Sequence, residues 1–299
     1  MNMKIYNFGS MNIDNVYRVH HIVRPGETIS SLGYQKNPGG KGLNQSIALA
    51  KAGMDVWHAG IAGKEDGDFL LDVLSQAGVH TDLIGRCDGR NGHCIIQVDD
   101  EGQNCIFLFG GSNHAVTDAY VDSVMEQMQS GDLLLLQNEI SGMDRILKRA
   151  AQKNLFVILN PSPMDEALLS LDLGCVSMFL LNEVEGADLA GTSDPDQILT
   201  VMHEKYPNAE IVLTLGSEGA IYSGRYGTFR QSAFTVRAVD TTAAGDTFTG
   251  FFIREYFESR DPAAALRIAS RASSIAVTRP GAAASIPLRE EVISADGSL

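Results

Sequence analysis

Short apolar runs alternate with amphipathic helical patterns along most of this chain, and this alternation restricts the fold more than any other feature. Two segments show the helical spacing, one with Leu43, Ile47 and Ala50, the other with Val121, Val124, Met125 and Met128. Strands connected through helices run parallel, with right-handed crossovers. We therefore predict an α/β fold, a doubly wound and mainly parallel sheet flanked by helices, with strands at residues 5–8, 55–59, 133–136, 156–159, 178–181 and 211–214.

Two regions, residues 13–36 and 90–109, contain strand-like segments and turn signals with no helical pattern between them. In the second region, segments 94–98 and 104–109 are joined by Asp99-Asp100-Glu101-Gly102, which is typical of a hairpin. These regions predict a small β lid inserted into a single domain that spans residues 1–299. An exposed lid edge can close over a ligand or pair with another copy, so we expect a homodimer formed through the lid.

The formal net charge of −14 over 299 residues argues against nucleic acid or an anionic membrane as the main partner. An anionic substrate would then need a local positive site, such as a helix N-terminus or a bound cation. The four cysteines form no CxxC pair, which indicates reduced thiols rather than a metal site. No secretory signal or membrane-spanning apolar run is visible, so we expect a cytoplasmic protein.

The segment AVDTTAAGDTF at residues 238–248 carries the strongest chemical signal. A short strand is expected to lead into small residues, and a helix to begin near Asp246. Ala243, Ala244 and Gly245 leave room for a ligand, and their amides at a helix start can stabilise phosphoryl charge. Asp246 in the first turn can accept a proton from an attacking hydroxyl. An ordinary helix start with an acidic first turn is the alternative interpretation, which the length of the string disfavours.

This string resembles the signature of the ribokinase-like (PfkB-type) carbohydrate kinases. Other segments resemble further motifs of that family in the family's order: GSMNID at residues 9–14, GGKGLNQ at 39–45, NEVE at 182–185 and TLGSEG at 214–219. Together they cover nearly the whole chain. The resemblance implies a kinase that uses ATP and Mg²⁺ to phosphorylate a hydroxyl of a small sugar. It also implies that Asp246 is the catalytic base and that Ala243, Ala244 and Gly245 form the anion hole.

Asn12 and Asp14 are two positions apart in an extended segment, so their side chains point the same way. An amide beside a carboxylate suits a vicinal diol, although a solvated turn would carry the same residues. The resemblance assigns both residues to the sugar. It assigns a wider set to the same substrate, namely Gly40, Lys41, Asn44, Glu139 and Asp246. The glycine-rich segment is not a P-loop, because Gly42 follows Lys41 and no GxxxxGK spacing is present.

Asn182 and Glu185 lie three positions apart at an expected helix start, hence on one face. The pair could orient Mg²⁺-bound water and phosphate, with Glu185 acting on Mg²⁺ through water. A helix cap of this composition is also common, and the two roles are compatible. By resemblance, the nucleotide is expected to contact these two residues together with Thr214, Gly216, Ser217, Gly219, Gly245 and Ser270.

The segment RPGAAAS at residues 279–285 follows the last long helical pattern. In the resembling family, this segment and the aspartate at the position of Asp240 form a monovalent-cation site beside the anion hole. The matching positions here are Asp240, Thr242, Ala276, Arg279, Gly281 and Ser285, and they imply activation by K⁺. A plain loop is the alternative interpretation of this segment.

The matched polar set favours D-ribose as acceptor and ribose 5-phosphate as product. Kinases of 2-deoxyribose, fructose or a nucleoside remain alternatives, because one hydroxyl can change selectivity without changing these motifs. A catalytically inactive sugar or nucleotide sensor of the same fold is an alternative from a different class. Such a sensor is expected to have lost the base or the anion hole, whereas Ala244, Gly245 and Asp246 are all present here.

Overall fold

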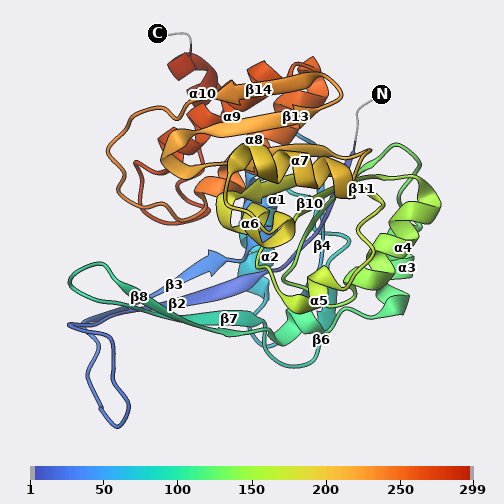
Figure 1. Cartoon of the computed structure of the whole chain (residues 1–299). Helices are drawn as coiled ribbons and strands as arrows, with labels where there is room; N and C mark the ends of the chain where they lie inside the picture. Colours follow the sequence, from blue (N-terminus) through green and yellow to red (C-terminus); the bar gives the residue numbers. More distant parts are fainter. Residues whose placement is uncertain (1–3, 297–299) are drawn as a thin grey trace.

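The computed structural model describes residues 4–296, and an eight-stranded sheet lies at its centre (Figure 1). Its strand order is β14-β13-β12-β11-β10-β9-β1-β4. The bounds are β1 (Ile5–Phe8), β4 (Val56–Ala59), β9 (Leu133–Gln137), β10 (Phe156–Asn160), β11 (Val176–Asn182), β12 (Glu210–Thr214), β13 (Ala220–Gly224) and β14 (Gly227–Gln231). The six strands from β12 to β4 are parallel and coincide with the six predicted ones. The doubly wound, mainly parallel sheet is confirmed.

Helices cover both faces of this sheet. One face packs against α1 (Lys41–Lys51), α2 (Asp68–Gln76), α8 (Ala244–Ser259), α9 (Pro262–Ala276) and α10 (Arg289–Asp296). The other packs against α3 (Asp118–Met125), α4 (Met143–Lys153), α5 (Glu166–Leu169), α6 (Glu183–Ala190) and α7 (Pro195–Lys205). Side chains alternate between the two cores: Leu133 and Leu135 join the first, Leu134 and Leu136 the second. Such strands are apolar on both sides because both faces are buried.

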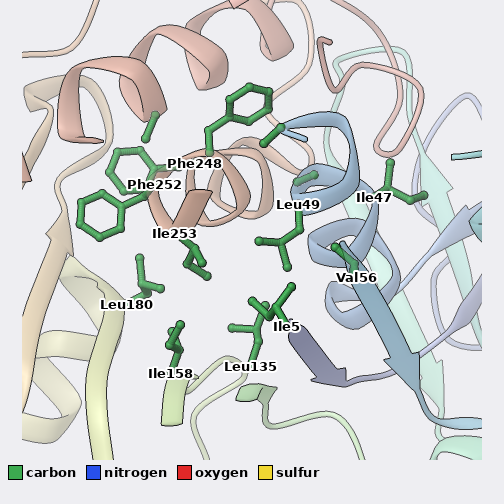
Figure 2. Close-up of a cluster of buried hydrophobic side chains, with 14 of the residues drawn as sticks. Ile5, Ile47, Leu49, Val56, Leu135, Ile158, Leu180, Phe248, Phe252 and Ile253 are labelled. Carbon is green, nitrogen blue, oxygen red and sulfur yellow. The ribbon is translucent and has the colours of Figure 1, made fainter. Parts of the chain in front are cut away.

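The first core fixes the position of α8. Figure 2 shows Ile158 and Leu180, from the sheet, and Phe252 and Ile253, from α8, gathered in one cluster. Helices α1 and α8 approach closely at Gly250, where an added Cβ would lie 2.5 Å from the Cβ of Ala48. This close packing brings the first turn of α8 beside the first turn of α1.

A separate four-stranded sheet projects from one side of the molecule (Figure 1). We call it the small sheet; it contains β3 (Gly33–Gly39), β2 (Asn12–Arg18), β7 (Gly92–Val98) and β8 (Asn104–Phe109), in that order. Its strands lie in the regions that predicted a small β-structure, with β2 and β3 extending slightly further, to Asn12 and Gly39. The end of the β2–β3 pair where Asn12 lies opposite Gly39 therefore reaches the predicted sugar-binding residues.

The remaining elements are short. Strands β5 (Ile61–Gly63) and β6 (Gly85–Cys87) form a two-stranded sheet. Two short 3₁₀ helices, η1 (Gly111–His114) and η2 (Gly216–Glu218), lie in loops. No helix within residues 4–296 is both long and apolar enough to cross a membrane.

The structure contradicts one expectation about secondary structure. Residues 232–243, which precede α8, are irregular, so the strand predicted there is absent. Val236 and Val239 are 41% and 63% exposed rather than buried in a sheet. The edge of the main sheet is instead formed by the antiparallel hairpin β13–β14, which no pattern in the sequence had predicted.

Candidate active site

The first turn of α8 forms the centre of the site. Its N-cap residue, Ala243, has a left-handed backbone with φ of 59°, which is uncommon for a residue other than glycine and is often found at functional sites. The Ala244 amide donates to the Thr241 carbonyl (3.2 Å), so this amide is engaged. The amides of Gly245 and Asp246 lie in the first turn, where no preceding helical carbonyl can accept them. Gly245 itself is open: apart from its own helical turn and chain neighbours, no atom of residues 4–296 lies within 4 Å of an added Cβ.

Asp246 is buried, at 8% exposure, and two neutral amides hold its carboxylate. Asn44 Nδ2 donates to Oδ2 (3.1 Å), and Gln45 Nε2 donates to Oδ1 (2.9 Å). Both donors come from the N-terminal half of α1, which the close contact with α8 brings into place. These two hydrogen bonds fix the orientation of the carboxylate, and a general base requires such a fixed position near the attacking hydroxyl.

Two cavities meet at this helix start. The smaller one, about 240 Å³, is lined by Asp246, Lys41, Asn182 and Glu185 among others. The larger one, about 470 Å³, extends toward η2 and α9. Thr214, Thr241, Ala244, Gly245 and Phe248 line both cavities, so the cavities adjoin at the N-terminus of α8. An elongated ligand can therefore cross from one cavity to the other past the helix amides.

The larger cavity brings together most of the predicted nucleotide contacts. Its lining includes Thr214, Gly216, Ser217, Gly219, Gly245 and Ser270. Gly219 has φ of 113°, and an added Cβ would lie 1.9 Å from the Gln231 carbonyl oxygen, so only glycine fits there. Another part of the lining comes from the irregular segment, namely Ala233, Phe234, Thr235, Val236 and Ala238. Apolar residues of that segment thus face a cavity.

Asn182 and Glu185 form a reciprocal cap at the start of α6. The Asn182 side chain accepts from the amides of Val184 and Glu185 (both 2.9 Å), and Glu185 Oε2 accepts from the Asn182 amide (3.0 Å). Glu185 is 5% exposed, and both residues line the smaller cavity. The cap therefore fixes the carboxylate of a residue that shares a cavity with Asp246 and the start of α8, where a phosphate-bound divalent cation could meet it. No cluster of three or more His, Cys, Asp or Glu side chains in residues 4–296 is arranged to hold a metal ion by itself.

The predicted sugar-binding residues form a connected group beneath the small sheet. Glu139 accepts hydrogen bonds from the Ser10 hydroxyl and from the Lys41 amide (2.9 Å). Burial raises the pKa of the Glu139 carboxyl, and these two hydrogen bonds only partly oppose the shift. Gly40, the N-cap of α1, lies against Ser10 and Asn12, with an added Cβ 3.0 Å from the Ser10 hydroxyl and the Asn12 amide.

Asn12 and Asp14 lie on β2, as their spacing predicted. Asn12 is 3% exposed, and its Oδ1 accepts from Asn113 Nδ2 (2.7 Å). Asp14 lies against Gly39, where an added Cβ would be 2.1 Å from a carboxylate oxygen. Burial raises the pKa of Asp14, and burial together with the Asp14 charge raises the pKa of the neighbouring Cys94 thiol to about 12. The lining of the two cavities includes Lys41 and Asp246 from the predicted sugar set, but not Asn12, Asp14, Gly40, Asn44 or Glu139.

Asp240 ties the segment before α8 to the loop after α9. Its carboxylate accepts from the amides of Thr242 (2.9 Å) and Gly281 (2.9 Å). Burial opposes ionisation, but these hydrogen bonds outweigh it, and the pKa of Asp240 lies below its usual range. Of the other predicted cation residues, Ser285 is fully buried and donates to the Ala282 carbonyl (2.8 Å). Ala276 accepts from the Arg279 amide (3.0 Å), and the Arg279 side chain pairs with Glu291.

Several residues of the site had no role assigned from the sequence. They are Ser10, Gln45, Asn113, Gln137 and Asn160. Gln137 and Asn160 stand in register at the carboxyl ends of β9 and β10. A signal was available, because polar residues that end a buried parallel strand lie where open α/β sheets bind ligands. Ser10 and Glu139 meet beyond the carboxyl ends of the neighbouring strands β1 and β9. The sheet continues from β1 to β4 on one side and from β9 to β10 on the other, so the strand order reverses between β1 and β9.

Comparison with known proteins agrees with this geometry. The model of the pfkB family of carbohydrate kinases matches residues 2–289. The chain is 33% identical to a ribokinase from Haemophilus influenzae over 297 residues, which cover 95% of each chain. A ribokinase structure from Cryptococcus neoformans, in complex with ADP, superposes with a TM-score of 0.84 at 31% identity, covering 98% of this chain and 99% of that one.

A second solved structure, an Arabidopsis thaliana ribokinase complexed with ribose and ATP, superposes with a TM-score of 0.85 at 28% identity, covering 98% of each chain. The family match spans almost the entire sequence, and the relatives align from end to end. The chain belongs to the pfkB family of carbohydrate kinases.

Proposed function

We propose that this kinase transfers the γ-phosphoryl group of ATP to a hydroxyl of D-ribose, giving ribose 5-phosphate. The observation that carries the proposal is the position of Asp246, a buried carboxylate where the two cavities adjoin at the start of a helix. The curated relatives at 30% identity or more include several ribokinases that align over nearly their whole length, and a solved Arabidopsis thaliana ribokinase of similar structure is complexed with ribose and ATP. Both cavities and the sugar-side group meet at this one helix start.

In this proposal the nucleotide occupies the larger cavity, against Thr214, Gly216, Ser217, Gly219 and Ser270. Its phosphates extend past Gly245 toward Asp246, where the amides of the first turn of α8 stabilise the transferring group, in line with the role expected for Ala243, Ala244 and Gly245. Asp246 accepts the proton of the attacking sugar hydroxyl. Lys41 lines the smaller cavity and supplies a positive charge near the transferring group.

Mg²⁺ fits the acidic side of the smaller cavity. Glu185 is a buried carboxylate there, and Asn182 fixes its orientation. Mg²⁺ prefers oxygen ligands, retains several waters and is commonly bound through phosphates and one or two carboxylates. We propose that Glu185 acts on the metal through water, which would neutralise the phosphate charge during transfer.

The sugar would bind beneath the small sheet, against Asn12, Asp14, Gly40, Asn44 and Glu139. These residues offer amide donors and two carboxylates, a combination that suits a polyhydroxylated acceptor. Asn44 also holds Asp246, so the same residue connects the sugar with the base. We propose that the small sheet acts as a lid that closes over the sugar, and that it belongs to a single domain spanning the chain.

The lid also supports a proposal about assembly. On β8, Ile106, Phe107, Leu108 and Phe109 are 57%, 69%, 51% and 51% exposed. Adjacent residues of a strand point to opposite faces, so this edge strand is apolar on both sides. We propose a homodimer formed through the lid, with the enzyme acting in the cytoplasm, where its free cysteines stay reduced.

Potassium activation is proposed at the loop beside α8. Asp240 joins the Thr242 and Gly281 amides, so the loop after α9 is attached to the segment that leads into the anion hole. A cation held by carbonyls and hydroxyls of Ala276, Arg279, Gly281 and Ser285 would add positive charge there. Replacing K⁺ by Na⁺ at constant ionic strength should lower kcat, whereas equal rates in both salts would argue against this site.

An acceptor panel tests the proposed function. ADP release is measured with ATP and Mg²⁺ across ribose, 2-deoxyribose, fructose and nucleosides, and the product is identified by phosphorus NMR. We expect the highest kcat/KM on ribose, with phosphate on the 5-hydroxyl. A higher kcat/KM on another acceptor would replace the substrate assignment. Binding of ribose and nucleotide without ADP release would favour a sensor of the same fold.

A further inference from the structure

A chain of buried amide side chains runs behind Asp246, on the side of the protein interior. Asn7 from β1, Gln137 from β9 and Gln45 from α1 are all fully buried. Gln137 Nε2 donates to Asn7 Oδ1 (3.0 Å) and to Gln45 Oε1 (2.6 Å). Gln45 Nε2 then donates to Asp246 Oδ1 (2.9 Å) and to Asn160 Oδ1 (2.9 Å).

The direction of every amide in this chain is fixed from the far end. Asn7 Nδ2 donates to the Gly42 carbonyl (2.8 Å), which can only accept, so Asn7 must turn its oxygen toward Gln137. Gln137 must then direct its NH₂ group toward Gln45, and Gln45 must direct its own NH₂ group toward Asp246. The interior therefore presents a donor to Asp246 before any ligand binds.

This arrangement has an energetic cost that a packing role does not explain. Gln137 uses its NH₂ group twice, while its Oε1 is buried without a hydrogen-bond partner among the described residues. A buried acceptor that loses its hydrogen bonds to water and gains none in the protein destabilises the folded state. Apolar side chains of similar volume at these positions would avoid that cost, as would a smaller number of buried amide side chains. The row of amide side chains nevertheless keeps this orientation, and Asp246, the proposed base, lies at its end.

We infer that Gln45, oriented by Gln137 and Asn7, is a positioning residue for Asp246 that holds its carboxylate in one orientation. The inference rests on the proposed function, because it assumes that Asp246 removes the proton of the acceptor. Gln45 contacts the base rather than the reacting atoms. Asn44 holds the other oxygen of Asp246, so the two amides from one helical turn fix both oxygens.

Charged groups around Asp246 also influence how kcat depends on pH. Lys41 on α1 and Glu185 on α6 line the same cavity as Asp246. Glu139, beyond β9, lies close enough for the charge of Asp246 to raise its pKa. All three stay unchanged in variants of Gln45, so a difference between profiles reports on Gln45 itself.

The test compares Gln45→Met and Gln45→Glu with Ser46→Ala. Methionine keeps the volume but removes both donors, and glutamate keeps the shape but places an acceptor against the carboxylate. Ser46 is the matched control, because it neighbours Gln45 on α1, is fully buried, and bonds Asn7 and His58 rather than Asp246. In Ser46→Ala the Gly42 carbonyl still accepts from Asn7 Nδ2, so the orientation of Asn7 is kept. For each variant, kcat, both KM values, the pH profile, the affinity for ADP and the melting temperature are measured.

We expect Gln45→Met to lower kcat by about 10- to 100-fold through misplacement of the base. The KM values and the affinity for ADP should stay within roughly threefold of the wild type, since ground-state binding is unchanged. The acidic limb of the kcat profile should move to higher pH, and further in Gln45→Glu. Ser46→Ala should lower the melting temperature without moving the profile.

The outcomes separate this inference from the proposed function. A wild-type kcat and pH profile in Gln45→Met would overturn the positioning role while leaving the kinase assignment intact. The same would hold if Ser46→Ala shifted the profile as much as Gln45→Met. If the wild-type chain phosphorylates no acceptor, the kinase proposal fails and the role of Gln45 fails with it.

Discussion

At the residue scale, the site is built from side chains whose neighbours restrict their orientation. Asp246 is held by two amides, Glu139 by a hydroxyl and a backbone amide, and Glu185 by its helix cap. The sequence predicted these three carboxylates, because each stands in a recognisable motif or follows a strand. It could not predict Gln45 or Gln137 as their supports. The sequence around a single glutamine does not show which way its side-chain amide points. That orientation becomes defined only when α1 and β9 pack together.

A residue-scale prediction concerns His58, which is fully buried on β4 and bonded through Nδ1 to the Ser46 hydroxyl (2.8 Å). Burial lowers its pKa to about 4, against the usual 6.5. A pKa that is lower in the folded state means that the protein loses stability as pH falls from about 6.5 toward 4, by up to about 3 kcal/mol. Urea unfolding at pH 7 and pH 4.5 should show this loss in the wild type.

The comparison variant is His58→Asn, whose amide can still meet Ser46 but does not titrate. It should be less stable than the wild type at pH 7, because it is smaller, yet lose less stability on acidification. Groups with raised pKa values, such as Glu139 and Asp14, act in the opposite direction in both proteins, so they cancel in the difference. Equal losses in the two proteins would rule out His58 as the acid-sensitive group.

At the element scale, the sequence predicted the parallel strands well and the antiparallel edge poorly. Strands β1, β4, β9, β10, β11 and β12 are buried on both faces, so each appears as a continuous apolar run. Segment 232–243 misled the prediction, because its apolar residues Val236 and Ala238 line a cavity rather than pair in a sheet. In β13–β14, the outer strand has polar residues at positions such as Arg230, and its run of apolar residues is broken.

The element-scale prediction concerns the start of α6. Glutamine can replace the glutamate of a capping box, so Glu185→Gln should keep the helix cap and the melting temperature. It should still raise the Mg²⁺ concentration needed for half-maximal activity by roughly tenfold, as expected when an oriented group that supports the metal ion is lost. Asn182→Ala provides the contrast, since loss of the cap should cost about 1 kcal/mol of stability. An unchanged Mg²⁺ response in Glu185→Gln would exclude the metal role.

At the scale of the whole molecule, the small sheet projects from the main sheet and its helices (Figure 1). Its edge strand, β8, exposes apolar side chains. The existence of that sheet was predictable from two helix-free regions. The way β8 pairs with β7 was predictable from the acidic turn between them. The orientation of the small sheet relative to the main sheet does not follow from the sequence, because it depends on surfaces that meet only after folding.

The whole-molecule prediction tests the lid dimer. Phe107→Lys, at 69% exposure, should leave the fold of the subunit intact but weaken self-association by at least about tenfold, because it places charge in an apolar interface. Sedimentation over a concentration series measures the change. Leu169→Lys is the control, since Leu169 is 51% exposed on α5, outside the small sheet. A wild type that stays monomeric, or equal effects of both variants, would contradict the proposed dimer.

The most direct test of the central claim is the turnover of Asp246→Asn with ATP, Mg²⁺ and ribose. Asparagine keeps the size of the side chain but cannot accept a proton. If Asp246 is the base, kcat should fall by about 10²- to 10⁴-fold, while the affinity for ADP, whose cavity lies beyond Gly245, stays near the wild-type value. A variant that phosphorylates ribose at the wild-type rate would contradict the assignment of Asp246 and the mechanism built on it.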